Sequence, residues 1–174
     1  MTPPSPVEAI RVRPATADDV SLLARWAEAM AFETESKHLD TATVTRGVAA
    51  GVADPARSRY FMADIGGEPV GTMMITFEWS DWRNGWWWWI QSVYVAPEHR
   101  RRGVYRALYG YVLTLAKADG GVCGLRLYVE RENVQAKRTY EFLGMKESGS
   151  ACTKPRSRRR ATRGDRTRWG NGRS

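Results

Sequence analysis

The sequence predicts an α/β domain, in which one mixed, mostly antiparallel sheet is flanked by helices. Three observations lead to this fold class. Short strand patterns and longer helical patterns alternate along most of the 174 residues. A Gly66-Gly67 turn joins two strand patterns as an antiparallel hairpin. A strand, a helix and a second strand over residues 86–129 form a βαβ unit, whose two strands are expected to be parallel.

The first half of the chain is expected to hold a strand, two helices and the hairpin. Alternating apolar and polar side chains indicate a half-buried strand that Pro14 ends. Thr16 and Asp19 have the spacing of a capping box, which predicts a helix beginning after them. The expected elements are a strand at 10–13, a helix over 20–30, a second, shorter helix within 32–55, and hairpin strands at 60–65 and 69–79.

The second half is expected to hold the βαβ unit and one further helix. A continuous apolar and aromatic strand is closed by Pro97, and the helix after it follows a period of about 3.6 residues. Asn133 is a good N-cap residue for the last helix, and Gly144 stands where a glycine often ends one. The expected elements are a strand at 86–95, a helix at 102–117, a strand at 122–129 and a helix at 134–143.

The net charge of +8 is confined to the end of the chain. Residues 1–145 carry 17 basic and 17 acidic side chains, whereas residues 146–174 carry 10 basic and 2 acidic ones. A body without net positive charge is unlike a domain that coats nucleic acid. Two cysteines are too few for a disulfide framework, and the longest apolar run is too short for a membrane span. We therefore expect a cytoplasmic protein with no membrane partner and no metal site.

We expect a flexible N-terminus over 1–9, one catalytic domain over 10–147 and a basic, disordered tail over 148–174. Three interpretations of the tail stay open. It is an arm that binds nucleic acid or another polyanion, an inert extension, or a segment from a shifted reading frame that replaced the final strand. The third is favoured because the strand and helix patterns of the body are lost in this segment.

The segment 93–105 leaves a strand, turns at Pro97 and opens a helix near Gly103. Amides in the first turn of a helix have no acceptor within it, and the helix dipole adds positive charge there. Gly103 lets a ligand approach the backbone, and the arginines at 100–102 can make charge-assisted contacts. These features predict a phosphate site, although an arginine run before a helix is also typical of a solvated basic face.

These residues resemble the acetyl-CoA-binding signature of the GNAT superfamily of N-acyltransferases, Arg/Gln-x-x-Gly-x-Gly/Ala after a strand ending in Val-x-Pro. The chain matches it at Arg100 and Gly103, preceded by Val95-Ala96-Pro97. A second family signature is Asn-x-x-Ala-x-x-x-Tyr-x-x-x-Gly-Phe. It is matched by Asn133, Ala136, Tyr140, Gly144 and, in the last place, Met145.

The resemblance implies a single-domain GNAT fold and an enzyme that moves acetyl from acetyl-CoA to a primary amine by direct attack. In that family the strand before the phosphate loop splays from its parallel neighbour, and pantetheine binds in the gap. The Val95 amide would polarise the thioester carbonyl. Tyr140 would protonate the departing thiolate, because a phenol and an alkyl thiol have similar pKa values. The implied cosubstrate contacts are Val93, Val95, Arg100, Arg101, Arg102, Gly103, Val104, Tyr105 and Asn133.

Two positions depart from the family pattern. Tyr105 stands where the signature has Gly or Ala, so its side chain must point away from the phosphates or narrow the site. Gln91 stands where polyamine-type relatives often have the Glu that deprotonates the amine, and an amide cannot accept that proton. The base is expected at Glu78, then at Glu33 or Glu35, or it acts through water or is dispensable. Each of these carboxylates is also typical of a solvated surface.

The tryptophan-rich segment 78–89 resembles the corresponding loop of diamine and polyamine N-acetyltransferases. Aromatic faces with carboxylates suit a cationic amine, but alternate tryptophans also fill a central strand or a dimer interface. The acceptor is expected to be a polyamine, an amino acid or a similar small molecule, or a peptide, and the family implies a homodimer. Two other functions stay open, namely a non-catalytic acyl-CoA-binding module and an acetylase with a nucleic-acid-binding tail.

Overall fold

The structure is a computed structural model that describes residues 9–129, 138, 140, 141, 144 and 145. The chain divides into two compact units, Met1–Glu130 and Arg131–Ser174. Asn133, the N-terminal segment 1–8 and the tail at 148–174 lie outside the described residues, so the predictions made for them stay predictions.

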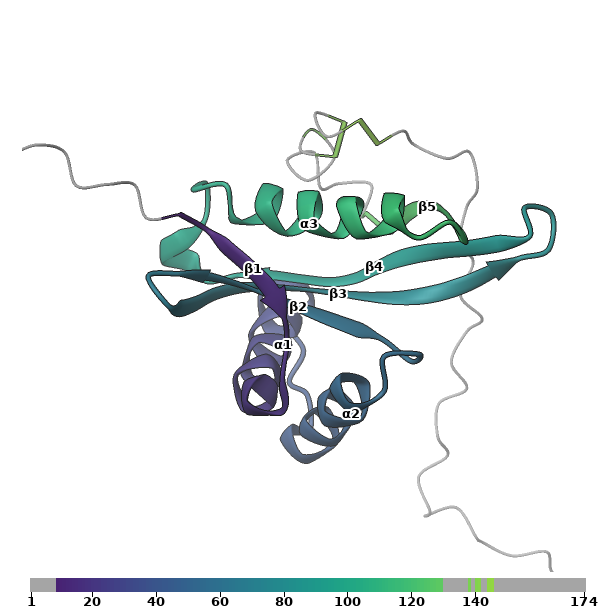
Figure 1. Cartoon of the computed structure of the whole chain (residues 1–174). Helices are drawn as coiled ribbons and strands as arrows, with labels where there is room; N and C mark the ends of the chain where they lie inside the picture. Colours follow the sequence, from purple (N-terminus) through teal and green to yellow (C-terminus); the bar gives the residue numbers. More distant parts are fainter. Residues whose placement is uncertain (1–8, 130–137, 139, 142–143, 146–174) are drawn as a thin grey trace, which may run out of the picture. The chain divides into compact units, whose positions relative to one another are not determined.

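The first unit contains one five-stranded sheet with the strand order β1-β2-β3-β4-β5 (Figure 1). Neighbouring strands are antiparallel except for β4 and β5, which are parallel, so the predicted mixed sheet with a βαβ unit is confirmed. The elements are β1 (Arg11–Pro14), a 3-10 turn (Ala17–Asp19), α1 (Val20–Glu35), α2 (Thr41–Ala53), β2 (Arg59–Ile65), β3 (Glu68–Ser80), β4 (Gly85–Val95), a 3-10 turn (Pro97–His99), α3 (Val104–Ala118) and β5 (Val122–Leu127).

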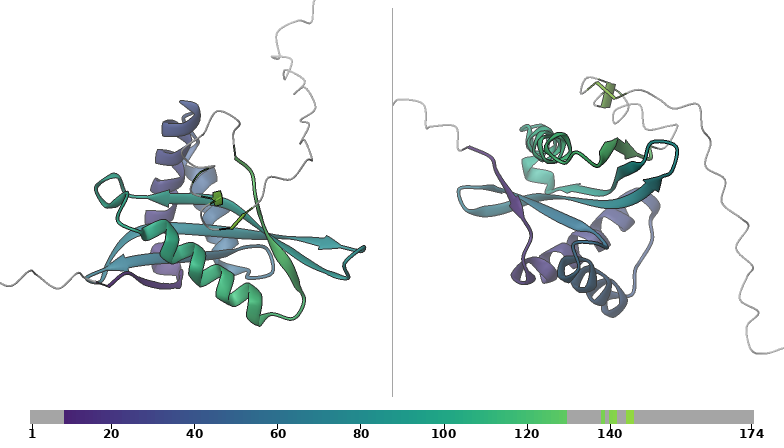
Figure 2. Two further views of the ribbon diagram at one scale, coloured as in Figure 1. Left: turned by 90° about the horizontal axis from the view of Figure 1, so that it is seen from above. Right: turned by 45° about the vertical axis from the view of Figure 1, so that its right-hand side comes forward.

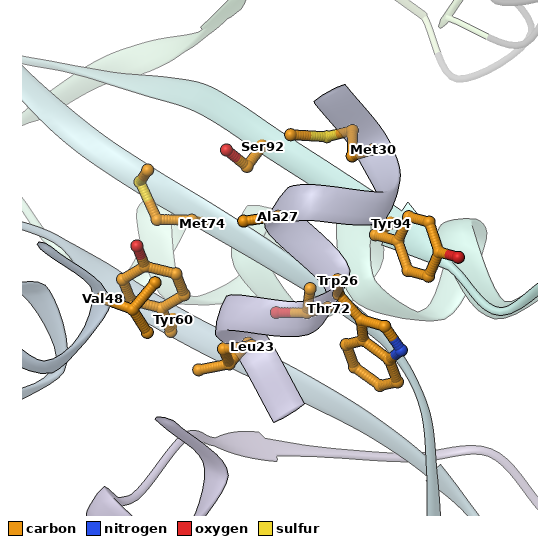
Figure 3. A pocket seen from close by; sticks show the side chains of 10 residues that line it. All are labelled: Leu23, Trp26, Ala27, Met30, Val48, Tyr60, Thr72, Met74, Ser92 and Tyr94. Carbon is orange, nitrogen blue, oxygen red and sulfur yellow. The ribbon is translucent and has the colours of Figure 1, made fainter. Parts of the chain in front are cut away.

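Helices α1 and α2 lie against one face of the sheet and α3 against the other (Figures 1 and 2). On the first face Leu23 and Val48 pack on Met62 in a buried cluster, and Figure 3 shows Leu23 and Val48 close to the sheet. On the second face α3 buries Leu108 and Val112, which are four residues apart and therefore share one helix face. Among the residues that the structure describes, no helix is long and apolar enough to cross a membrane.

Helix α1 extends further than predicted, and this changes the place of Glu33 and Glu35. The sequence assigned both to a second helix, whereas they lie in the last turn of α1. The residue that follows the helix, Ser36, has a φ of +50°, which is in the left-handed region. Glycine usually takes that position, so the end of α1 has no marker in the sequence.

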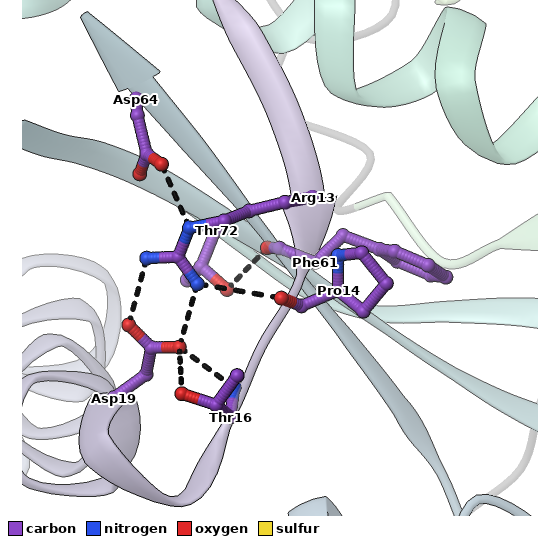
Figure 4. Close-up of polar contacts among 7 residues, drawn as sticks. All are labelled: Arg13, Pro14, Thr16, Asp19, Phe61, Asp64 and Thr72. Carbon is purple, nitrogen blue, oxygen red and sulfur yellow. Dashed lines mark hydrogen bonds and ion pairs between the residues drawn. The ribbon is translucent and has the colours of Figure 1, made fainter. Parts of the chain in front are cut away.

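Arg13 of β1 holds two carboxylates together (Figure 4). Its guanidinium binds the Asp19 carboxylate at 2.8 and 3.0 Å and the Asp64 carboxylate at 2.7 Å. The Thr16 amide donates to Asp19 at 2.7 Å, which confirms the predicted capping interaction, although the first turn is a 3-10 turn. The hydrogen bond from Arg13 holds the pKa of the Asp19 carboxyl below its usual value, despite burial of that group. Arg13 thereby ties β1 to β2 and to the start of α1.

At Gly71 of β3 the start of α3 lies close against the sheet. A Cβ atom there would lie 2.9 Å from the Tyr94 carbonyl oxygen and 2.9 Å from Val104 Cγ1. The sequence analysis did not single out Gly71, although a glycine within a strand pattern is a signal of close approach.

The described residues of the second unit end a helix. Arg138, Tyr140 and Glu141 are helical, and Gly144 has a φ of +82°. The Gly144 amide donates to the Glu141 carbonyl at 2.9 Å, and the Met145 amide donates to the Tyr140 carbonyl at 3.0 Å. The predicted helix end at Gly144 is confirmed.

We expect Gly71→Ala to lower the free energy of unfolding by about 1–3 kcal/mol, because a backbone oxygen cannot move away from the added methyl group. Denaturant titration measures the change. Gly47→Ala is the control, since Gly47 is exposed on α2 and nothing lies within 4 Å of its Cβ position. That change should leave stability unaltered or raise it by up to about 1 kcal/mol. Equal effects of the two substitutions would contradict the close approach at Gly71.

The Asp19 carboxyl has a lower pKa in the folded protein than in the unfolded chain, so below about pH 4 the unfolded chain binds more protons. Its contribution to stability is present above the unfolded pKa and is lost as the pH falls through the folded pKa. We expect Asp19→Asn to make the free energy of unfolding less dependent on pH below about pH 4. Denaturant titrations over that range test this, with the exposed neighbour change Asp18→Asn as the control. An unaltered pH dependence in Asp19→Asn would rule the effect out.

Candidate functional site

Strands β4 and β5 are paired over only the first half of β4. The ladder joins residues 86–90 of β4 to residues 122–127 of β5 and ends at Ile90 and Leu127. Strand β4 continues to Val95. From Gln91 to Val95, β4 has no partner strand on this side among the described residues. The parallel pairing therefore ends within β4, as expected where two strands splay, and we call the unpaired side of residues 91–95 the gap.

The register with β3 decides which way the backbone groups of β4 point. The Ala96 amide donates to the Val70 carbonyl of β3 at 2.9 Å. Because these directions alternate along a strand, the amides of Val93 and Val95 point away from β3 and into the gap. The Val95 carbonyl points the same way and accepts a hydrogen bond from Arg100 Nε at 3.0 Å. Both residues thus present backbone groups where the sequence predicted a pantetheine contact.

A bulge in β4 lies where the two strands part. Ser92 and Ile90 pair with consecutive β3 residues, so Gln91 is the extra residue between them. A bulge bends a strand and increases its twist, which helps β4 to turn away from β5. Gln91 is exposed, and its amide donates to a threonine hydroxyl of β3 at 3.2 Å.

The chain turns after β4 and enters α3 through two residues with left-handed backbone. Arg101 has a φ of +64° and Gly103, the residue before the helix, a φ of +87°. A Cβ atom at Gly103 would meet Ile10 Cδ1 in ordinary van der Waals contact at 3.9 Å, with no closer atom. The first hydrogen bond within α3 is donated by Ala107 to the Gly103 carbonyl at 3.0 Å. The amides before Ala107 therefore point out of the positive end of the helix, which suits an anionic group.

The residues of the signature at the start of α3 differ in exposure and in their neighbours. Arg101 and Arg102 are exposed at the start of α3, and Val104 is buried beneath it. The Tyr105 ring stacks on Tyr109 one turn further along the helix, with ring centroids 6.2 Å apart. The Tyr105 ring therefore lies along α3 toward Tyr109. Its orientation relative to the phosphates stays a prediction.

Arg100 contacts α1 and the end of β4. Its guanidinium lies 2.6 Å from the Glu33 carboxylate, and its Cζ is 5.7 Å from the centre of the Tyr94 ring. The Tyr94 hydroxyl also donates to Glu33 at 3.3 Å. Burial, with the nearby charge of Glu33, raises the pKa of Tyr94. Arg100 and Glu33 therefore connect the end of α1 to the Val95 carbonyl.

The three candidate bases have different surroundings. Glu33 pairs with Arg100, which also binds the Val95 carbonyl, whereas Glu35 pairs with Lys37 on the surface. Glu78 pairs with Arg126 at 3.1 Å and accepts a hydrogen bond from the Trp89 indole. The sequence analysis did not single out Arg126, although a charge between two leucines of a strand indicates a side chain on the opposite face. In the part of the chain that the structure describes, no group of acidic, histidine or cysteine side chains is placed to hold a metal ion.

Tyr140, the predicted acid, belongs to the second unit. It is partly buried, and burial raises the pKa of its hydroxyl, so the phenol stays protonated at neutral pH. Its role as a proton donor to the thiolate stays a prediction.

A small cavity lies between α1 and the sheet, on the side of β4 that carries Ser92 and Tyr94 (Figure 3). Its volume of about 30 Å³ is enough for about one water molecule. The lining side chains come from both helices of this face and from three strands: Leu23, Trp26, Ala27, Met30, Val48, Tyr60, Thr72, Met74, Ser92 and Tyr94.

Comparison with known proteins identifies relatives of this arrangement. The model of the Acetyltransferase (GNAT) family matches residues 21–145. The crystal structure of a possible acetyltransferase from Clostridium difficile 630 is 41% identical, with 85% of this chain and 97% of that chain covered and a TM-score of 0.79. A search of curated protein sequences finds no match.

Two more distant structures share the fold. A predicted acetyltransferase from Clostridium acetobutylicum with acetyl-CoA is 17% identical, with 84% of this chain and 96% of that chain covered and a TM-score of 0.69. An aminoglycoside N-acetyltransferase in complex with CoA is 13% identical, with 90% of this chain and 99% of that chain covered and a TM-score of 0.71.

We expect a double-mutant cycle of Glu33→Gln and Arg100→Gln to give a coupling of about 0.2–1 kcal/mol in the free energy of unfolding. The two side chains are 39% and 44% exposed, so water weakens the pair and high salt should reduce the coupling. Asp54→Asn with Arg57→Gln gives a matched cycle for an exposed pair 3.7 Å apart, which should couple less. No coupling between Glu33 and Arg100 at low salt would contradict the link between α1 and β4.

Proposed function

The chain belongs to the GNAT family of acetyltransferases and is an acyltransferase, and on this premise we propose that it transfers acetyl from acetyl-CoA to a primary amine of a small molecule or peptide. The observation that carries the proposal is the backbone of Val93 and Val95, which faces the gap left by β5. The relatives that bind acetyl-CoA and CoA support the choice of cosubstrate.

Each part of the cosubstrate has a candidate position. The start of α3, with Arg101, Arg102 and Gly103, suits the pyrophosphate, because amides, helix dipole and guanidinium groups all favour an anion there. The pantetheine arm suits the gap, where the Val93 and Val95 amides are donors. Asn133 is proposed as a further contact to this arm.

The chemistry that this arrangement supports is direct attack on the thioester. The amine nitrogen forms a bond to the carbonyl carbon, and the C–S bond breaks. The Val95 amide stabilises the charge on the carbonyl oxygen, and Tyr140 gives its proton to the thiolate. The attacking amine must also lose a proton, which water can accept. Glu78, Glu33 and Glu35 stay candidates to receive it, and all three are in ion pairs. Positioning of the two substrates supplies much of the rate enhancement.

One observation favours a second candidate function. Gln91 stands at the bulge where polyamine-type relatives often have Glu, and the carboxylates on both sides of it are paired with arginines. A protein that binds acyl-CoA without turnover would need no base. Homodimer formation, a cytoplasmic location and nucleic-acid binding by the tail stay predictions.

The test is to mix the full chain with acetyl-CoA and a panel of primary amines and to follow the release of free thiol. We expect turnover with at least one amine. Tyr140→Phe should lower kcat by roughly tenfold or more and leave acetyl-CoA binding unaltered, because it removes only the acid. Tyr111→Phe is the control. Tyr111 packs its ring on Phe61, and the substituted phenylalanine keeps the ring that makes this contact.

Each other outcome identifies a different function. Tight acetyl-CoA binding without thiol release from any amine would favour the non-catalytic module. The absence of both binding and turnover would refute both candidates, and an unaltered kcat in Tyr140→Phe would remove Tyr140 as the acid.

A further inference from the structure

A cluster of aromatic and charged side chains lies where β4 and β5 part, and the proposed binding of acetyl-CoA uses none of them. We call Glu78, Trp87, Trp89, Arg126 and Tyr128 the apex cluster. The register places Glu78 beside Trp87 and Arg126 beside Trp89. Tyr128 directly follows the last residue of β5 that pairs with β4.

The apex cluster faces the same side of the sheet as α1. Along β3, Met74, Thr76 and Glu78 alternate with residues on the other face, and Met74 lines the cavity beneath α1. Along β4, Trp87 and Trp89 alternate with Trp88, which is buried on the opposite side. The cluster therefore lies on the same face of the sheet as the cavity that Ser92 lines.

The carboxylate and the aromatic face of the cluster that could bind a cation already contact Arg126 of the chain itself. Arg126 pairs with the Glu78 carboxylate at 3.1 Å, and its Cζ lies 3.9 Å from the centre of the Trp87 ring. The Trp89 indole donates to the same carboxylate. The Trp87 indole lies against Gly124 of β5, where a Cβ atom would be 2.9 Å from the indole. Arg126 is thus in the position that an ammonium group of a substrate would otherwise take.

The other carboxylate beside the gap is also paired, because Glu33 binds Arg100 at 2.6 Å. A second or third ammonium group that reached Glu33 or Glu78 would meet a carboxylate that already has an arginine partner. A like charge close to a cation costs binding free energy.

The surface that remains open at the gap is aromatic. Tyr128 is 62% exposed and stacks on Trp89, with ring centroids 4.4 Å apart and 24° between the planes. An exposed aromatic surface of this kind favours contact with a flat or apolar group over contact with a further charge. The cavity under α1 has a volume of only about 30 Å³, so it is too small to enclose an acceptor by itself.

We propose that Arg126 determines acceptor specificity: by occupying Glu78 and Trp87, it makes the protein prefer amines with one charge and an aromatic or apolar group over polyamines. This inference rests on the proposed acetyl transfer. It departs from the expectation of a polyamine acceptor that the tryptophan-rich segment suggested.

The test compares kcat/KM for phenethylamine, which has one charge and a ring, with kcat/KM for spermidine, which has three charges. The native protein should prefer phenethylamine. Arg126→Gln should shift the ratio toward spermidine by roughly fivefold or more, because it releases Glu78 and the face of Trp87. The shift should disappear when Glu78→Gln is added, since the released carboxylate causes it. Arg57→Gln, which removes an exposed guanidinium on the turn after α2, should leave the ratio unaltered.

The same comparison is made from binding, by calorimetry on the full chain saturated with CoA. The ratio of the two dissociation constants should shift in the same direction in Arg126→Gln. Lack of thiol release would then count against acetyl transfer, while the binding ratio still tests the role of Arg126. A native preference for spermidine, an unaltered ratio in Arg126→Gln, or no binding of either amine would overturn the inference.

Discussion

Strand β4 is held by β3 along its whole length but by β5 along only its first half, and the positions of the other site elements follow from this difference. Backbone groups of β4 that a longer β5 would bond instead face the gap. Pairing ends at Ile90, and the bulge at Gln91 bends β4 away at that point. The unpaired edge of β4 can therefore bond to an extended ligand that carries amide groups. The pantetheine arm of CoA is such a ligand.

The rest of the first unit keeps this edge in place. Gly71 lets the start of α3 approach the sheet, so the positive end of that helix lies close to the end of β4. Arg100 joins the Val95 carbonyl to Glu33 and so connects the edge to α1 on the other face. On the far side of the sheet Arg13 ties β1 to the start of α1. Each contact is modest by itself, but together they fix α1, α3 and the sheet around the unpaired edge of β4.

Much of the fold could be predicted, because periodicity and turn residues mark most of its elements. The Gly66-Gly67 hairpin and the βαβ unit are present as predicted. The end of α1 was misplaced because Ser36 takes a conformation that glycine usually marks. At the site, backbone contacts of Val93 and Val95 were implied by the family resemblance, and the register of β4 with β3 points their amides away from β3.

The pairing of charges could not be predicted, because it depends on side chains that are far apart in the sequence. Glu33 and Arg100 are on different elements, and so are Glu78 and Arg126. Sequence alone gives both carboxylates as free candidates for binding a cation or accepting a proton. The structure shows that each has an arginine partner, which changes the expected acceptor and leaves water as the proposed proton acceptor.

The most direct measurement is amide hydrogen exchange of β4 by NMR, with and without acetyl-CoA. The Ser92 and Tyr94 amides bond to β3 and should exchange slowly in both states. The Val93 and Val95 amides face the gap, so they should exchange quickly alone and become protected when acetyl-CoA is bound. Protection of all four amides in the free protein, or no change at Val93 and Val95 on binding, would contradict the assignment of the gap as the cosubstrate site.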